Sequence, residues 1–113
     1  MTTFWFALED AGCLWVQPGG HRGPLRERFV ADSGGLRIEP LDPLPWPAGD
    51  SAHALEVAAG TLVVLHGLLP HHSAANRSAS SRHAYTLHAV DARAAYASTN
   101  WIQRPAAFPA RGF

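Results

Sequence analysis

Cysteine, lysine and long apolar runs are scarce or absent in this chain of 113 residues, and each absence excludes a class of protein. The single cysteine, Cys13, cannot form a disulfide within the chain or a cysteine-based zinc cluster, so a reducing compartment is expected. No apolar run approaches the ~18 residues of a membrane span, and the opening "MTTFWFALED" lacks the basic start and apolar centre of a signal peptide. We therefore expect a soluble, cytoplasmic protein.

The charges of the chain are balanced, without an excess of either sign. Nine basic residues, all arginine, offset nine acidic ones, and the isoelectric point is about 7.1. No electrostatic footprint for nucleic acid or an anionic membrane is present, so a small molecule is the expected partner. The length suits one domain with a modest core, and we predict that residues 1–113 belong to a single domain.

Short alternating segments predict strands. Residues 4–9 alternate apolar side chains in the period of a strand with two different faces, and residues 82–90 do the same. Further strands are expected at "CLWVQ", "LRIEP" and the two halves of "HALEVAAGTLVVLHG". One helical turn is expected within "GPLRERFVADSGG", a proline-rich loop over residues 40–51, and an irregular tail over residues 103–113.

About six short strands with almost no helix predict an all-β sandwich or barrel. A closed jelly roll needs eight strands. Because fewer are expected here, one or more sheet edges should lie open unless another chain covers them.

The candidate chemistry lies in "HGLLPHHSAANRSASSRHAYTLH", residues 66–88. His71 and His72 cannot both face one metal ion on a strand, because neighbouring side chains point to opposite faces. Arg82 follows His71 by 11 residues, enough for two antiparallel neighbours to present both side chains to one cavity. A neutral imidazole suits Fe(II), and a guanidinium can hold a carboxylate by two parallel hydrogen bonds. The simpler alternative is that Arg82 only opens an exposed strand.

The same stretch resembles the signature of the phytanoyl-CoA dioxygenase family, non-haem iron oxygenases that use 2-oxoglutarate. Three more segments resemble the family in the right order: "FWFALEDAGCLWVQPGGHRGPLR", "VAAGTLVVLHG" and "NWIQRP". The resemblance implies that the chain corresponds to the C-terminal part of such a domain. The implied fold is a partial double-stranded β-helix of jelly-roll or cupin type, open-edged for lack of its N-terminal strands.

Carried over by position, the resemblance implies that His71 is an iron ligand, the second histidine of a set of two histidines and one carboxylate. Arg82 matches the arginine that holds the far carboxylate of 2-oxoglutarate, and Ser73 matches a hydroxyl that assists it. Trp5 matches an aromatic residue that lines the cosubstrate pocket. The implied cofactors are Fe(II) and 2-oxoglutarate, and no residue is assigned as catalytic. Three further matching residues are interpreted as structural: His66, Asn76 and Tyr85.

Two departures from the family pattern bear on activity. The family takes its first two iron ligands from a His-x-Asp motif, and none of the seven histidines here has a carboxylate two positions later. The set of ligands is therefore incomplete, and the chain alone is expected to bind iron poorly and not to turn over. The connection "EDAGCLW" is also shorter than in relatives, where it often ends in Glu-Asn.

Three interpretations stay open at this level. The first is part of an active oxygenase whose remaining half lies elsewhere. The second is a degenerate, non-catalytic β domain that binds a partner through open strand edges. The partners expected at such edges are a second copy of the chain, giving a homo-oligomer, or a complementing N-terminal half. The third is a metal site in a new arrangement, built from members of one set of histidines: His66, His71, His72 and His88. The substrate does not follow from the sequence.

Overall fold

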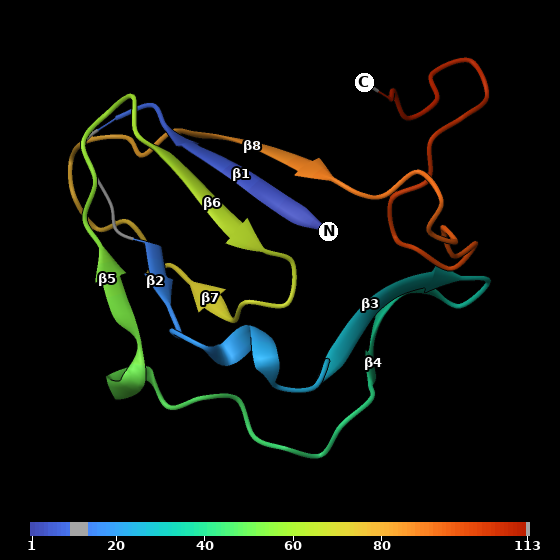
Figure 1. The fold of residues 1–113 in the computed structure, drawn as a ribbon, viewed down its shortest axis with the longest axis horizontal. Helices are drawn as coiled ribbons and strands as arrows, with labels where there is room; N and C mark the ends of the chain where they lie inside the picture. The colour runs from blue at the N-terminus through green and yellow to red at the C-terminus, as the bar shows by residue number, and fades with distance from the viewer. Residues whose placement is uncertain (10–13, 113) are drawn as a thin grey trace. The chain divides into compact units, whose positions relative to one another are not determined.

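The computed structural model describes residues 1–9 and 14–112 (Figure 1). Cys13 and most of the shortened connection lie outside these residues. The ordered elements of the described part are strands and 3-10 helices, so the expected β-rich class is confirmed. Their bounds are β1 Thr2–Ala7, β2 Leu14–Val16, η1 Gly20–Arg22, β3 Glu27–Asp32, β4 Gly35–Pro40, η2 Gly49–Ser51, β5 His53–Leu55, β6 Leu62–His66, β7 His71–His72 and β8 Ala84–Ala89. No helix of this part is long and apolar enough to cross a membrane.

The chain divides into two compact units, each built from two separate segments. The first unit joins Met1–Pro24 to Pro45–Val90, and the second joins Leu25–Leu44 to Asp91–Phe113. The first unit contains two three-stranded antiparallel sheets, with strand orders β6-β1-β8 and β5-β2-β7.

The alternation of residues 2–7 places one side of β1 in the core. Thr3 and Ala7 are buried, whereas Phe4 and Phe6 are only partly covered, as the period of a strand requires. In the β1–β6 pairing Thr3 lies opposite Leu65, which is also buried. This side of the sheet is called the inner face.

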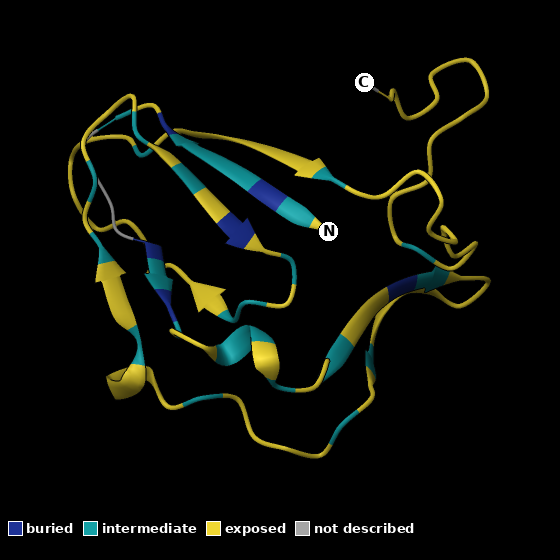
Figure 2. Ribbon diagram, in the orientation of Figure 1, coloured by how far each residue is buried: buried dark blue, intermediate teal, exposed yellow. Residues whose placement is uncertain are grey.

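The core of the first unit lies between the inner faces of the two sheets. Leu65 from β6 packs with Leu14 and Val16 from β2, and three partly buried side chains surround them: Leu55, Val63 and Leu69. Figure 2 shows the corresponding dark patches on β1, β2 and β6. Thr3 is the buried polar side chain here, and its hydroxyl is satisfied by a 2.9 Å hydrogen bond to Nδ1 of His88 on β8.

The second unit is built around the β3–β4 hairpin. Its two-residue turn, Ser33-Gly34, is fixed by Asp32, whose Oδ1 accepts a 2.8 Å hydrogen bond from the Gly34 N–H. That bond and the Arg37 guanidinium lower the pKa of Asp32. Val30, 2% exposed, forms a bridge to Asn100. The prediction of a helical turn in this region is therefore wrong. Asp32 caps the turn at Ser33-Gly34, and this turn brings residues 27–32 alongside residues 35–40 as a strand.

The other predicted strands are confirmed, although their edges shift. The alternating run 82–90 becomes β8, and "HALEVAAGTLVVLHG" splits into β5 and β6. The break falls at Gly60, whose φ of 85° is a left-handed conformation that favours glycine. Residues 103–112 contain no helix or strand.

Candidate functional site

His71 and His72 form the short strand β7 and point to opposite faces of their sheet. His71 lies opposite Val16, which is buried in the core, whereas His72 lies opposite Trp15. The His72 ring stacks on Trp15 with centroids 6.2 Å apart and planes 13° from parallel. The expectation that the two imidazoles cannot face one ion is confirmed. His71 is the one that shares the core-facing side of the sheet.

The hydrogen bonding of His71 fixes its tautomer. Its Nδ1 lies 2.8 Å from the carbonyl oxygen of Leu69. A carbonyl oxygen can only accept, so Nδ1 carries the proton and donates it. Nε2 of the neutral ring is left with its lone pair, which is the arrangement found in most metal-binding histidines.

An open cavity of about 320 Å³ lies where β2 ends and β5 and β7 begin. It is lined by Gln17, Trp46, Pro47, Ala48, Gly49, Ala52, Pro70, His71 and His72. His71 is thus accessible to a small molecule. Among the described residues, Trp5, Ser73 and Arg82 lie outside this lining.

Arg82 lies two residues before β8, which begins at Ala84. Its Nη1 donates a 3.1 Å hydrogen bond to the carbonyl oxygen of Ala74, three residues beyond His71. The guanidinium therefore reaches back across the loop toward the end of β7. The prediction that His71 and Arg82 lie on neighbouring strands is wrong, because β7 pairs with β2 and β8 pairs with β1, in different sheets. A separation of 11 residues suits a hairpin, but here it accommodates a crossing from one sheet to the other.

The two remaining predicted residues occupy contrasting places. Trp5 lies on β1 between Val63 and Thr86 of the flanking strands, and alternation puts it on the inner face with Thr3. Ser73 is exposed and directly follows β7. Asn76 bonds the loop backbone as predicted, since its Oδ1 accepts from the Ser78 N–H and its Nδ2 donates to the Ser80 carbonyl.

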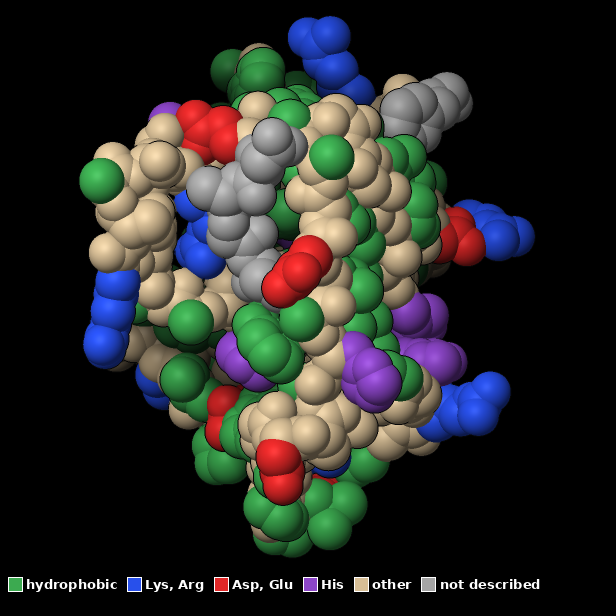
Figure 3. All heavy atoms as spheres, turned by 90° about the vertical axis from the view of Figure 1, so that its left-hand side faces the viewer, with side chains coloured by type: hydrophobic (Ala, Val, Ile, Leu, Met, Phe, Trp, Pro, Cys, Tyr) green, Lys and Arg blue, Asp and Glu red, His purple; other side chains and the backbone are tan. Residues whose placement is uncertain are grey.

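The described residues fit a metal ion only in part. His71 offers one nitrogen donor, but no group of three or more His, Cys, Asp or Glu side chains in the described ranges lies close enough to hold a metal. Histidine side chains do reach the surface on the face drawn in Figure 3. One pair, His21 and His66, lies with ring centroids 5.2 Å apart. The interpretation as a metal site built from several of these histidines therefore gains no support from their positions.

Sequence analysis did not identify Glu9, which bonds the neighbours of Arg82. Glu9, just after β1, accepts hydrogen bonds from the Ser81 hydroxyl and from the His83 imidazole and backbone N–H, at 2.8, 3.1 and 2.9 Å. The imidazole bond, followed by those of the hydroxyl and the N–H, lowers the pKa of Glu9 to about 2. The only signal in the sequence is a carboxylate at a strand end, and its partners lie more than 70 residues away.

Comparison with known proteins identifies the family of this chain. Residues 1–84 match the family model described as Phytanoyl-CoA dioxygenase (PhyH). A protein of Arabidopsis thaliana named "Phytanoyl-CoA dioxygenase" is 41% identical over 108 residues, which cover 91% of this chain and 38% of that protein. "Phytanoyl-CoA dioxygenase 1" of Oryza sativa subsp. japonica is 42% identical over 110 residues, with the same coverage.

A mouse protein named "Phytanoyl-CoA dioxygenase domain-containing protein 1" is 39% identical over 108 residues, covering 88% of this chain and 36% of that protein. The chain thus spans less than two fifths of the length of these relatives. The family match covers most of the chain, including both β7 and Arg82. The chain belongs to the phytanoyl-CoA dioxygenase family.

Proposed function

We propose that this chain forms the C-terminal portion of a non-haem Fe(II)- and 2-oxoglutarate-dependent dioxygenase that hydroxylates a small organic or lipid-like molecule. The observation that carries the proposal is the state of His71. Its ring lies on the core-facing side of its sheet, borders a cavity, and keeps Nε2 free because Nδ1 donates to Leu69. A histidine held in this way is suited to bind a ferrous ion.

The order of the strands supports a double-stranded β-helix. Along the first unit the chain runs from β1 in one sheet to β2 and β5 in the other, back to β6, across to β7 and back to β8. Repeated crossing between two antiparallel sheets is typical of jelly rolls. In this fold the inner faces enclose the site, which is where Trp5 and His71 lie.

Each of the other residues has a role in holding the cosubstrate. Arg82 uses one N–H on the Ala74 carbonyl, and its fork keeps further donors that suit the far carboxylate of 2-oxoglutarate. Ser73 is proposed to supply a hydroxyl to the cosubstrate, and Trp5 an apolar wall of its pocket. When iron is bound, it supplies the activation of dioxygen, coupled to oxidative decarboxylation of the keto acid.

The chain alone is proposed to be incomplete as a catalyst. A single imidazole binds iron weakly. Among the described residues, no group of three or more His, Cys, Asp or Glu side chains supplies the remaining protein ligands. The two further ligands are expected from a His-x-Asp motif, which no histidine of this chain provides.

Paramagnetic broadening tests the proposal, because it detects a site even at low occupancy. Mn(II), as a stand-in for Fe(II), is titrated into the 113-residue chain while histidine ring signals are followed by NMR. The His71 signals should broaden at the lowest Mn(II) concentration. In His71→Ala, no histidine signal should broaden ahead of the others. His72→Ala is the matched control, since that ring lies on the other face. Equal broadening of all exposed histidines would contradict the assignment.

A second function, a non-catalytic binding module, is favoured by one surface. The face of sheet β6-β1-β8 opposite the core is apolar, and Figure 2 shows much of β8 and part of β6 exposed. Its large exposed side chains are Leu62, Val64, Tyr85 and Leu87. Such a face suits a second copy of the chain or another polypeptide. Sedimentation equilibrium of the purified chain tests this function, and a strict monomer that binds Mn(II) at His71 would exclude self-association.

A further inference from the structure

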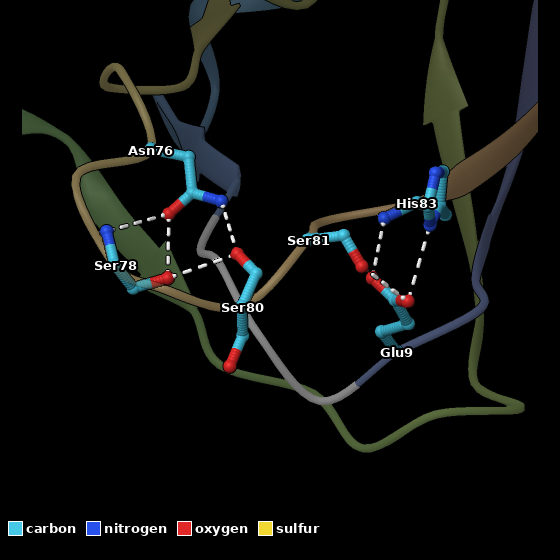
Figure 4. A network of polar contacts seen from close by, with 6 residues as sticks. All are labelled: Glu9, Asn76, Ser78, Ser80, Ser81 and His83. Carbon is cyan, nitrogen blue, oxygen red and sulfur yellow. Dashed lines mark hydrogen bonds and ion pairs between the residues drawn. The ribbon is translucent and has the colours of Figure 1, made fainter.

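The carboxylate of Glu9 accepts hydrogen bonds from Ser81 and His83 (Figure 4), the two residues on either side of Arg82 in the sequence. Its Oε1 accepts from the Ser81 hydroxyl at 2.8 Å and from His83 Nδ1 at 3.1 Å, and its Oε2 accepts from the His83 N–H at 2.9 Å. The Leu8 N–H also donates to the His83 carbonyl at 3.1 Å. The residues that flank Arg82 are therefore fixed to the end of β1.

In the described part of the chain, the loop between β7 and Arg82 is ordered by its own hydrogen bonds and by Glu9. Residues 73–81, between the end of β7 and Arg82, are exposed, so core packing does not hold this segment. Within the loop, Asn76 and Ser78 bind each other and the Ser80 carbonyl, which closes the loop on itself. That closed loop is joined to the end of β1 through the bonds of Glu9.

The charge of Glu9 strengthens this anchor. Hydrogen bonds to an ionised carboxylate are stronger than neutral ones. The same bonds lower the pKa of Glu9 to about 2, so the group is ionised at any physiological pH. Three of its roughly four acceptor positions are occupied by Ser81 and His83, so its lone pairs are directed to the loop.

We infer that Glu9 is the positioning residue of Arg82: it holds the segment 81–83 so that the guanidinium can meet the far carboxylate of a dicarboxylate keto acid. The inference rests on the proposed function and deepens it. Glu9 acts through Ser81 and His83, the neighbours of Arg82, and does not touch the ligand. Substitution of Glu9 should therefore lower the affinity for a ligand with a second carboxylate while the chain stays folded.

Binding of 2-oxoglutarate and pyruvate to the 113-residue chain tests this role. Pyruvate lacks the second carboxylate, so the ratio of the two affinities, measured by ligand-observed NMR, isolates the contribution of the arginine. The wild type should prefer 2-oxoglutarate, and Arg82→Ala should lose the preference. Glu9→Gln, which keeps one acceptor oxygen, should reduce it severalfold, and Glu9→Ala should reduce it further.

Asp91→Asn is the matched control. Asp91 is an exposed carboxylate whose pKa, like that of Glu9, is lowered by hydrogen bonds, but its partner is Arg93. This variant should keep the preference, and amide exchange at His83 should accelerate only in the Glu9 variants. Faster exchange with an unchanged preference in Glu9→Ala would overturn the inference and leave the proposed function intact. No preference in the wild type, or no effect of Arg82→Ala, would instead overturn the part of the proposed function that gives Arg82 the far carboxylate of the cosubstrate.

Discussion

Leu62 and Leu65 lie on the same strand and differ in the face that they occupy. Leu65 is 4% exposed and packs with Leu14 and Val16, whereas Leu62 is 46% exposed and lies opposite Phe6 on the other face. The two leucines therefore form an internal comparison. Truncation of each to alanine measures which face of the sheet is covered.

The expected magnitudes follow from burial. A buried Leu→Ala change costs about 2–5 kcal/mol, from lost transfer energy and the cavity left behind. Leu65 belongs to a small core, so we expect about 3 kcal/mol, or roughly 12 °C in Tm for a chain of this size. Leu62 has only about half of its side chain removed from water, and its truncation should cost about 1 kcal/mol or less.

The assay is urea unfolding at pH 7, followed by tryptophan fluorescence. Trp5, Trp15 and Trp46 belong to the first unit, so the signal reports mainly on that unit. Equal losses for Leu62→Ala and Leu65→Ala, or a larger loss for Leu62→Ala, would refute the assignment of the inner face. The inward placement of Trp5 would fail with it, because Trp5 lies opposite Val63, between these two positions.

Three further measurements test particular residues. The His71 ring should show a protonated Nδ1 and an unprotonated Nε2 in long-range ¹H–¹⁵N spectra at pH 8, and the reverse tautomer would contradict its bond to Leu69. Gly60→Ala should destabilise the fold by about 1 kcal/mol because φ is 85°, whereas Gly49→Ala, whose added Cβ meets open space, should be near neutral in the same thermal unfolding assay. The pKa of Glu9 is depressed to about 2, so its contribution to stability is present above its usual pKa of 4.5 and lost as the pH falls toward 2. Urea midpoints of wild type and Glu9→Gln should therefore differ at pH 7 and converge near pH 2.

The strands of the first unit were largely predictable from alternation. Residues 4–9 and 82–90 carry a clear period of two, and Gly60 marks the break between β5 and β6. The β3 strand was not recognised, because glycines on both sides of a short charged segment fit a helical turn equally well. Its identity depends on the pairing with β4 and on the cap that Asp32 gives to the turn.

The residues of the candidate site were predicted from one local motif, and that assignment stays a prediction, whereas the placement of their strands was not predictable from the motif. The motif around His71 and Arg82 is local in sequence, and alternation places the two neighbouring histidines on opposite faces. The assignment of β7 and β8 to different sheets depends on competition among strands for β1 and β2, which no local pattern encodes. The bonds between Glu9 and His83 join residues 74 positions apart and have no signature at either end.

The two compact units are interleaved along the chain, and this has a consequence for proteolysis. A single cut in the proline-rich connection, between Leu44 and Pro45, leaves two pieces that each contribute one segment to both units. Strand pairs β1–β6 and β2–β5 would bridge the nick in one unit, and the bridge from Val30 to Asn100 would do so in the other. The nicked polypeptide should therefore migrate as one species under native conditions and separate into fragments only in denaturant.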